Sequence, residues 1–104
     1  YPSYNIVENR QEGNYRIEVA VPGWGKKELE VIHENETLVV KGNKERKLGE
    51  NEQFVHQGLS LKSFERKFIL NADLKVDSVE KANGLLTIAL SRTPNSERKI
   101  LDIL

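Results

Sequence analysis

The sequence predicts an all-β domain, and three observations support this fold class. Apolar and polar residues alternate with period two along several segments, as side chains do on the two faces of a strand. No segment sustains the residue spacing of an amphipathic helix. Pairs such as Pro-Gly and Asn-Gly, which favour tight turns, separate the alternating segments. The length of 104 residues suits one domain with a modest core.

The first strand with a clear apolar face is expected over residues 15–21. Every second residue of this segment contributes to that face: Tyr15, Ile17, Val19 and Val21. Pro22 and Gly23 end the strand, because proline fixes its φ angle and glycine permits a turn. The segment that follows, WGKKE, is expected to form a short helical turn.

A β-hairpin is predicted next. Alternation over residues 29–34 and the apolar run LVVKG flank the short connection ENET. Within this connection, Asn35-Glu36-Thr37 matches the glycosylation triplet. We interpret the triplet as turn chemistry, because the pattern is common by chance and no secretion signal is recognisable in the chain.

Two further segments are predicted to be core strands. SFERKFIL places four residues on one face: Phe64, Arg66, Phe68 and Leu70. KVDSVEKA then passes through Asn83-Gly84, a pair favoured in two-residue hairpin turns because both residues tolerate positive φ. The strand after this turn carries Leu86, Ile88 and Leu90 on its core face.

The charged segment over residues 43–60 is long for a connection inside a compact domain. It contains one short strand candidate, residues 53–57. Two interpretations stay open: a floppy surface loop, or an arm that carries this strand outward to pair with another chain. Residues 92–99 are polar, with a proline near their start, and are expected to be a linker.

Composition excludes several function classes. The 16 basic and 16 acidic residues cancel, so no global field attracts nucleic acid or an anionic membrane. The absence of cysteine rules out disulfides and thiolate chemistry and fits a reducing cytoplasm. No apolar run approaches the roughly 18 residues of a membrane span, so a soluble protein is expected. Since the chain begins at Tyr1, we expect that a leading segment is missing.

The sequence offers little that resembles catalytic or ligand-binding chemistry. Two histidines are too few for a typical zinc site, and the pairs Glu28/Glu30 and Glu34/Glu36 have the spacing of a solvated strand face. The PGWG segment lacks the residues that cradle a phosphate, and no nucleophile-elbow pattern is present. We therefore expect no catalytic residue, no cofactor and no metal.

Two features need another explanation. Arg66 alternates in phase with apolar residues, which is costly unless its guanidinium is paired within the fold or across an interface, or reaches the solvent at an edge. The chain also ends in an aliphatic cluster beyond the polar linker: Ile100, Leu101, Ile103 and Leu104. This cluster is either a core strand or a ligand that docks by β-augmentation, with Leu101 and Ile103 pointing the same way.

With these features together, the chain resembles the α-crystallin domain of small heat shock proteins, most closely the bacterial inclusion-body-binding type. The matching stretches cover nearly the whole chain in order: YPSYNI, YRIEVAVPGWGKKELEV, LVVKG, FVHQGLSLKSFERKFIL, NGLLTIAL and ERKILDIL. The family signature A-x-x-x-N-G-x-L maps onto four residues: Val79, which replaces the alanine, Asn83, Gly84 and Leu86. The family's interface arginine corresponds to Arg66, and its terminal I-x-I motif to Leu101-Asp102-Ile103.

The resemblance implies a two-sheet antiparallel β-sandwich over residues 1–91, with a dimerisation loop at about residues 43–60 and an extension over residues 92–104. In bacterial-type dimers the loop strand pairs with the first strand of the partner. The implied interface residues are Tyr4, Asn5, Ile6, Val7, Gln53, Phe54, Val55, His56, Gln57 and Arg66. The implied groove for tails or clients is lined by Leu29, Val31, His33, Val76, Val79 and Lys81. His33 and Lys81 depart from the small or aliphatic residues usual at their positions.

The activity that the resemblance implies is ATP-independent holding of unfolding proteins. Its partners are further copies of the chain, unfolded clients and ATP-driven refolding chaperones, in the cytoplasm. Three alternatives stay open: a monomeric β-sandwich co-chaperone, a structural assembly subunit and, least favoured by the missing site residues, a hydrolase.

Overall fold

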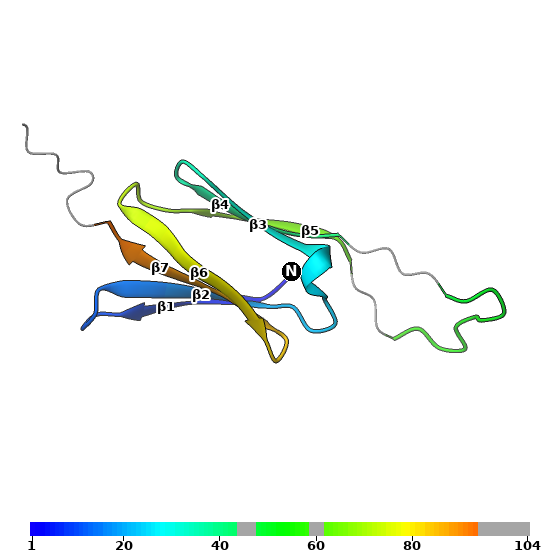
Figure 1. Cartoon of the computed structure of the whole chain (residues 1–104). Coiled ribbons are helices and arrows are strands. Elements are labelled where there is room, and N and C mark those ends of the chain that lie inside the picture. The colour runs from blue at the N-terminus through cyan, green and yellow to red at the C-terminus, as the bar shows by residue number, and fades with distance from the viewer. Residues whose placement is uncertain (44–47, 59–61, 94–104) are drawn as a thin grey trace, which may run out of the picture.

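The computed structural model of the chain describes residues 1–43, 48–58 and 62–93. Two antiparallel sheets pack face to face (Figure 1). One sheet has the strand order β1 (Tyr4–Asn9), β2 (Asn14–Ala20), β7 (Leu85–Arg92) and β6 (Leu74–Ala82). The other has the order β3 (Leu29–Glu34), β4 (Thr37–Gly42) and β5 (Phe64–Ile69). The single 3-10 turn of the described residues, η1 (Lys26–Glu28), lies where a short helical turn was predicted.

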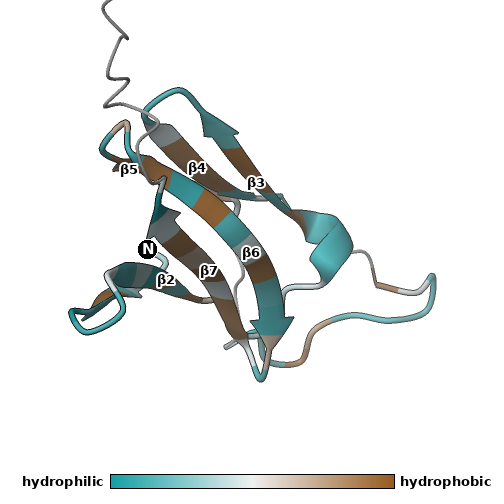
Figure 2. Cartoon of the chain, turned by 60° about the vertical axis from the view of Figure 1, so that its left-hand side comes forward, coloured by the Kyte–Doolittle hydropathy of each residue, from teal (hydrophilic) through white to brown (hydrophobic). Residues whose placement is uncertain are grey.

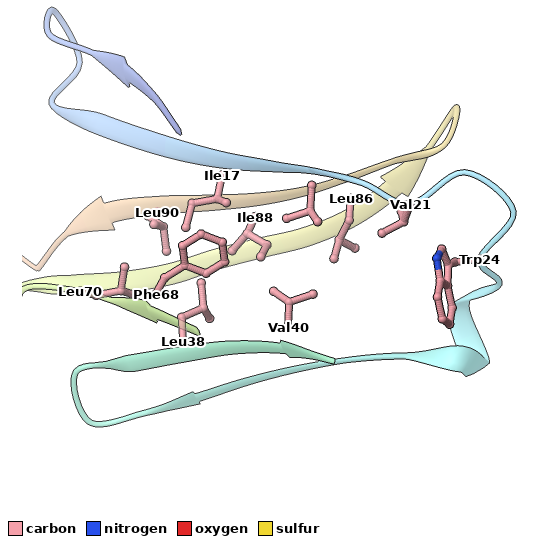
Figure 3. Packing of buried hydrophobic residues seen from close by; sticks show 11 residues of the cluster. Ile17, Val21, Trp24, Leu38, Val40, Phe68, Leu70, Leu86, Ile88 and Leu90 are labelled. Atoms are coloured by element: carbon pink, nitrogen blue, oxygen red, sulfur yellow. The ribbon is translucent and has the colours of Figure 1, made fainter. Parts of the chain in front are cut away.

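Apolar side chains from both sheets fill the space between them and form the core (Figure 3). The buried apolar residues are Ile17, Val19, Val21, Trp24, Leu38, Val40, Phe68, Leu70, Leu86, Ile88 and Leu90. Apart from Trp24, which lies between β2 and η1, they recur at every second residue of their segments, because successive side chains of a strand point to opposite faces. The all-β prediction and the two-sheet sandwich are therefore confirmed.

Two tight turns have the backbone geometry that their sequences predict. At the β6–β7 turn, Asn83 and Gly84 have φ angles of 54° and 75°, and Gly84 lies against Pro22 of the neighbouring loop. Asn35 in the β3–β4 turn also has a φ angle of 54°. Asparagine and glycine tolerate this left-handed region better than other residues, so both hairpins form where predicted.

A β-bulge interrupts the pairing of β6 with β7 between Val76 and Ser78. Val76 is opposite Leu90 and Val79 is opposite Ile88, so both valines share the inner face although they are three positions apart. Simple alternation would place them on opposite faces. The extra residue of the bulge is what allows Val76, Val79 and Lys81 to face the same side.

The segment between β4 and β5 leaves the sandwich at one end, and its described residues 48–58 lie beyond that end (Figure 1). Its base is closed by a hydrogen bond in which Ser63 Oγ donates to Asn43 Oδ1 at 3.1 Å. The strand predicted over residues 53–57 is not formed in this single chain. A strand requires a neighbouring strand, and neither of the two described sheets includes residues 53–57. We call residues 43–63 the arm.

β1 continues to Asn9, two residues past Val7, the last β1 residue that the resemblance implies for the interface, and β7 ends at Arg92. The terminal cluster predicted as a docking motif lies outside the described residues.

Candidate functional site

The edge strands β3 and β6 belong to different sheets and lie along the same side of the sandwich, where they border a groove (Figure 2). We call it the β3–β6 groove. Its volume is about 560 Å³, and its lining residues are Lys26, Leu29, Val31, Val79, Glu80, Lys81, Ala82 and Leu86. Within the described ranges neither edge strand has a second neighbouring strand. The groove therefore offers apolar side chains and free strand edges together.

The β3–β6 groove has an apolar floor and a charged rim. Leu29 and Val31 are half-buried against the core, and Leu86 is 4% exposed. Val79 is 43% exposed, which is unusual for an apolar side chain on the inner face of a sheet. Such a surface is suited to an extended segment whose alternate side chains are apolar, because main-chain hydrogen bonds and side-chain pockets then act together.

The structure brings together four of the six residues predicted for this groove. Leu29, Val31, Val79 and Lys81 line it. His33 lies on the inner face further along β3, opposite Leu38, and is exposed. Val76 packs against the core rather than lining the groove. These two residues lie along the same seam but outside the groove itself.

The sequence prediction missed three lining residues, and it placed Leu86 on the core face and in the family signature rather than in the groove. Lys26 belongs to η1, whose position beside the groove depends on packing between the sheets. Glu80 and Ala82 alternate with the predicted residues of β6 and reach the groove because it opens at the free strand edge. The period-two pattern assigns them to the opposite face, so no sequence signal identifies them.

A second groove lies at the opposite side of the sandwich, between edge strands β1 and β5. We call it the β1–β5 groove. Its volume is about 430 Å³, and its lining residues are Tyr4, Ile6, Tyr15, Ile17, Lys67, Phe68, Ile69, Leu70, Asn71, Leu74 and Leu90. Ile6 and Ile69 are 59% and 79% exposed. Large aliphatic side chains are therefore exposed at this groove too.

Arg66 contacts β1 of its own chain. Its guanidinium carbon lies 4.5 Å from the centroid of the Tyr4 ring, within the range of a cation–π interaction. The same ring packs edge-to-face on Phe68, with centroids 5.0 Å apart. Tyr4 thus joins β1 to β5 across the sandwich. This contact explains how a guanidinium is accommodated on an otherwise apolar face; the predicted role of Arg66 between subunits stays a prediction.

Two other predicted interface residues of β1, Asn5 and Val7, lie on its outer face, whereas Ile6 lies on the inner face. Asn5 donates a hydrogen bond to Glu18 at 3.2 Å, and Arg16 forms an ion pair with the same carboxylate at 2.9 Å. The hydrogen bonds from Arg16 and then Asn5 lower the pKa of Glu18. Val7 is half-buried on the same face. In the described chain β1 pairs with β2 alone, so its other edge is open.

The predicted arm residues are mostly exposed. Val55 is 99% exposed and Phe54 is 43% exposed, while the residues on either side of this pair are polar. Burying the Val55 side chain against another surface would remove apolar area from water, and this would stabilise the arm. The structure does not bring these residues near β1 of the same chain (Figure 1).

A polar network closes the end of the sandwich where β7 ends. The Arg92 guanidinium pairs with Asp73 and donates to the Tyr15 hydroxyl at 3.1 Å, and that hydroxyl donates to Glu8 at 3.2 Å. The hydrogen bonds that Arg92 donates, to Asp73 first and then to Tyr15, raise the pKa of its guanidinium. Thr93 Oγ1 donates to the Asp73 carbonyl at 2.7 Å. The network fixes the point at which the chain leaves β7.

The described residues contain no group of three His, Asp or Glu side chains placed to hold a metal ion. A helix long and apolar enough to cross a membrane is also lacking in this part of the chain.

Comparison with known proteins places these surfaces in context. The Hsp20/alpha crystallin family matches residues 7–103. The small heat shock protein IbpA of Yersinia pestis is 39% identical over 92 residues, which cover 88% of this chain and 66% of that relative. The chain therefore spans about two thirds of the length of this curated relative.

Solved structures with the same architecture include two small heat shock proteins. One, from Synechococcus phage S-ShM2, is 30% identical with a TM-score of 0.74, over 100% of this chain and 97% of that chain. A C-terminally truncated AgsA from Salmonella typhimurium is 28% identical with a TM-score of 0.75, over 100% of this chain and 98% of that chain.

Proposed function

This chain belongs to the Hsp20/alpha crystallin family, and from that premise we propose that it is an ATP-independent chaperone that holds unfolding proteins and prevents their aggregation. The observation that carries this proposal is the β3–β6 groove, in which apolar side chains lie beside two free strand edges. Unfolding proteins expose extended apolar segments, and these are the segments that this surface fits.

Holding requires binding and release, without making or breaking a covalent bond. An apolar side chain buried in the groove contributes about 1.5–3 kcal/mol at best. Binding through one or two side chains is therefore weak and reversible. Several grooves acting on one client raise the overall affinity, because later contacts form at a high effective concentration.

Assembly into dimers and larger oligomers is part of the proposal. The arm of one subunit adds a strand to the open edge of β1 in another, so that residues 53–57, which belong to neither sheet of the described chain, gain a neighbouring strand. Leu101 and Ile103, whose placement is outside the described residues, then dock in the β3–β6 groove of a neighbouring dimer. Clients and tails would compete for the same surface.

We infer the setting and the remaining partners from membership of the family. We place the protein in the cytoplasm, which fits its lack of cysteine, and expect ATP-driven chaperones to refold the clients that it releases. Neither nucleic acid nor a metal has a role in this proposal.

The groove is tested by adding one carboxylate on either face of β6. Val79→Glu places a charge in the groove, whereas Ser78→Glu places the same charge on the opposite, exposed face of the same strand. Aggregation of a heated client is followed by light scattering without nucleotide. The original chain and Ser78→Glu should suppress scattering, and Val79→Glu should suppress it less, because a buried charge opposes apolar contact. Equal suppression by both variants would remove the groove from the mechanism.

A further inference from the structure

The inner face of β1 carries an apolar residue that the sandwich leaves uncovered. Ile6 is directly opposite Ile17 in the β1–β2 ladder, so the two side chains point to the same face. Ile17 is 1% exposed, whereas Ile6 is 59% exposed. The difference arises because Ile6 lies on the edge strand, at the mouth of the β1–β5 groove. Ile6 thus has the position of a core residue but is left uncovered by the residues that the structure describes.

The β1–β5 groove is lined by aromatic rings as well as aliphatic side chains. Tyr4 and Phe68 pack edge-to-face at its wall, and Tyr15 contributes a third ring. Aromatic rings gain from packing against other rings in this geometry. A further aromatic side chain entering beside Ile6 would therefore find favourable partners.

A second copy of the chain supplies such a side chain. Phe54 is the single aromatic residue between Trp24 and Phe64, and it is 43% exposed. Because the arm projects away from its own β1 (Figure 1), the β1 that it reaches belongs to another copy. The open β1 edge and the mouth of the β1–β5 groove are continuous, so a strand added at that edge places alternate side chains beside Ile6.

We propose that Phe54 of the partner subunit packs beside Ile6 and closes the β1–β5 groove when two copies associate. This inference rests on the proposed pairing of the arm with β1 and specifies which face of the arm is turned inward. Val55 then lies on the outer face, beside Asn5 or Val7, since neighbouring residues of a strand point to opposite sides. The β1–β5 groove is closed in the dimer and open in the monomer, so only the monomer offers it to clients.

Because the chain has no cysteine, disulfide trapping tests this proposal in the full chain. A tagged chain with Ile6→Cys is mixed with an untagged chain carrying Phe54→Cys, allowed to exchange subunits and oxidised mildly. The matched control replaces Phe54→Cys by Val55→Cys. All three positions are exposed, so the substitutions should leave the fold intact. The yield of tagged–untagged heterodimer is read from a non-reducing gel.

The proposal expects the Phe54→Cys pair to cross-link about tenfold faster than the Val55→Cys pair, because a disulfide needs Cβ atoms about 3.5–4.5 Å apart. Faster cross-linking by Val55→Cys would overturn the inward position of Phe54 while leaving arm pairing with β1 intact. If neither pair cross-linked while light scattering still showed dimers, the arm pairing in the proposed function would fail as well.

Discussion

The contact between Arg66 and Tyr4 predicts a measurable coupling between two residues 62 positions apart in the sequence. Replacing Tyr4 by Ala removes a cation–π interaction worth about 0.5–1 kcal/mol and an aromatic pair worth about 0.5–1.5 kcal/mol. The expected loss of stability is therefore about 1–2.5 kcal/mol. Tyr4→Phe should cost far less, since both contacts use the ring rather than the hydroxyl.

A double-mutant cycle isolates the cation–π interaction. Arg66→Met keeps an unbranched apolar side chain and removes the charge, so it should lose about 0.5–1 kcal/mol. The cycle compares the original chain, Arg66→Met, Tyr4→Ala and the double variant in urea unfolding. All four are measured at the same chain concentration, because subunit association adds to apparent stability.

The expected coupling energy is about 0.5–1 kcal/mol, and each single variant should also weaken dimerisation, because β1 is then held less firmly against β5. Additive losses, or a Tyr4→Phe variant as unstable as Tyr4→Ala, would refute the role given to the ring.

Three other predictions follow from particular residues. Gly42→Ala should destabilise the chain by about 1–3 kcal/mol in urea unfolding, because a Cβ there overlaps the Phe64 ring; Phe64→Leu should restore part of the loss, and an unchanged midpoint would contradict this packing. Changing Leu101 and Ile103 together to Ala should convert larger assemblies to dimers in light scattering, whereas a constant molar mass would exclude tail docking. The pKa of Glu18 is lowered in the folded chain, so its ion pair with Arg16 favours the folded state. This contribution is complete at pH values above the ordinary carboxyl pKa, and it is lost as the pH falls through the lowered pKa. Glu18→Gln should therefore show a smaller loss of stability on acidification, and an identical pH profile would count against that interaction.

Local sequence signals were sufficient for the turns and for the strands of the sandwich other than β1, which only the family resemblance implied. Asn83 and Gly84 specify a hairpin through their tolerance of positive φ, and the alternation from Tyr15 to Val21 identifies a buried face. Both signals depend on neighbouring residues, so the chain need not be folded for them to be recognised. The resemblance to a family then supplied how the strands are arranged in two sheets.

Features that arise when distant segments meet could not be derived from the pattern. The bulge at Val76 and Ser78 changes which residues of β6 share a face, and period-two alternation gives no sign of it. The Tyr4 contact that accommodates Arg66 exists only because β1 and β5 border the same side of the sandwich. The predicted strand over residues 53–57 depends on pairing with another strand, and neither described sheet includes these residues.

The central claim is tested most directly by heating a heat-labile client with a stoichiometric amount of the chain, without ATP, and measuring the mass of soluble complexes by size-exclusion chromatography with light scattering. The account predicts that client and chain elute together in a complex heavier than either protein alone. A client recovered only as a pellet, with the chain eluting at its own mass, would contradict the proposed holding activity.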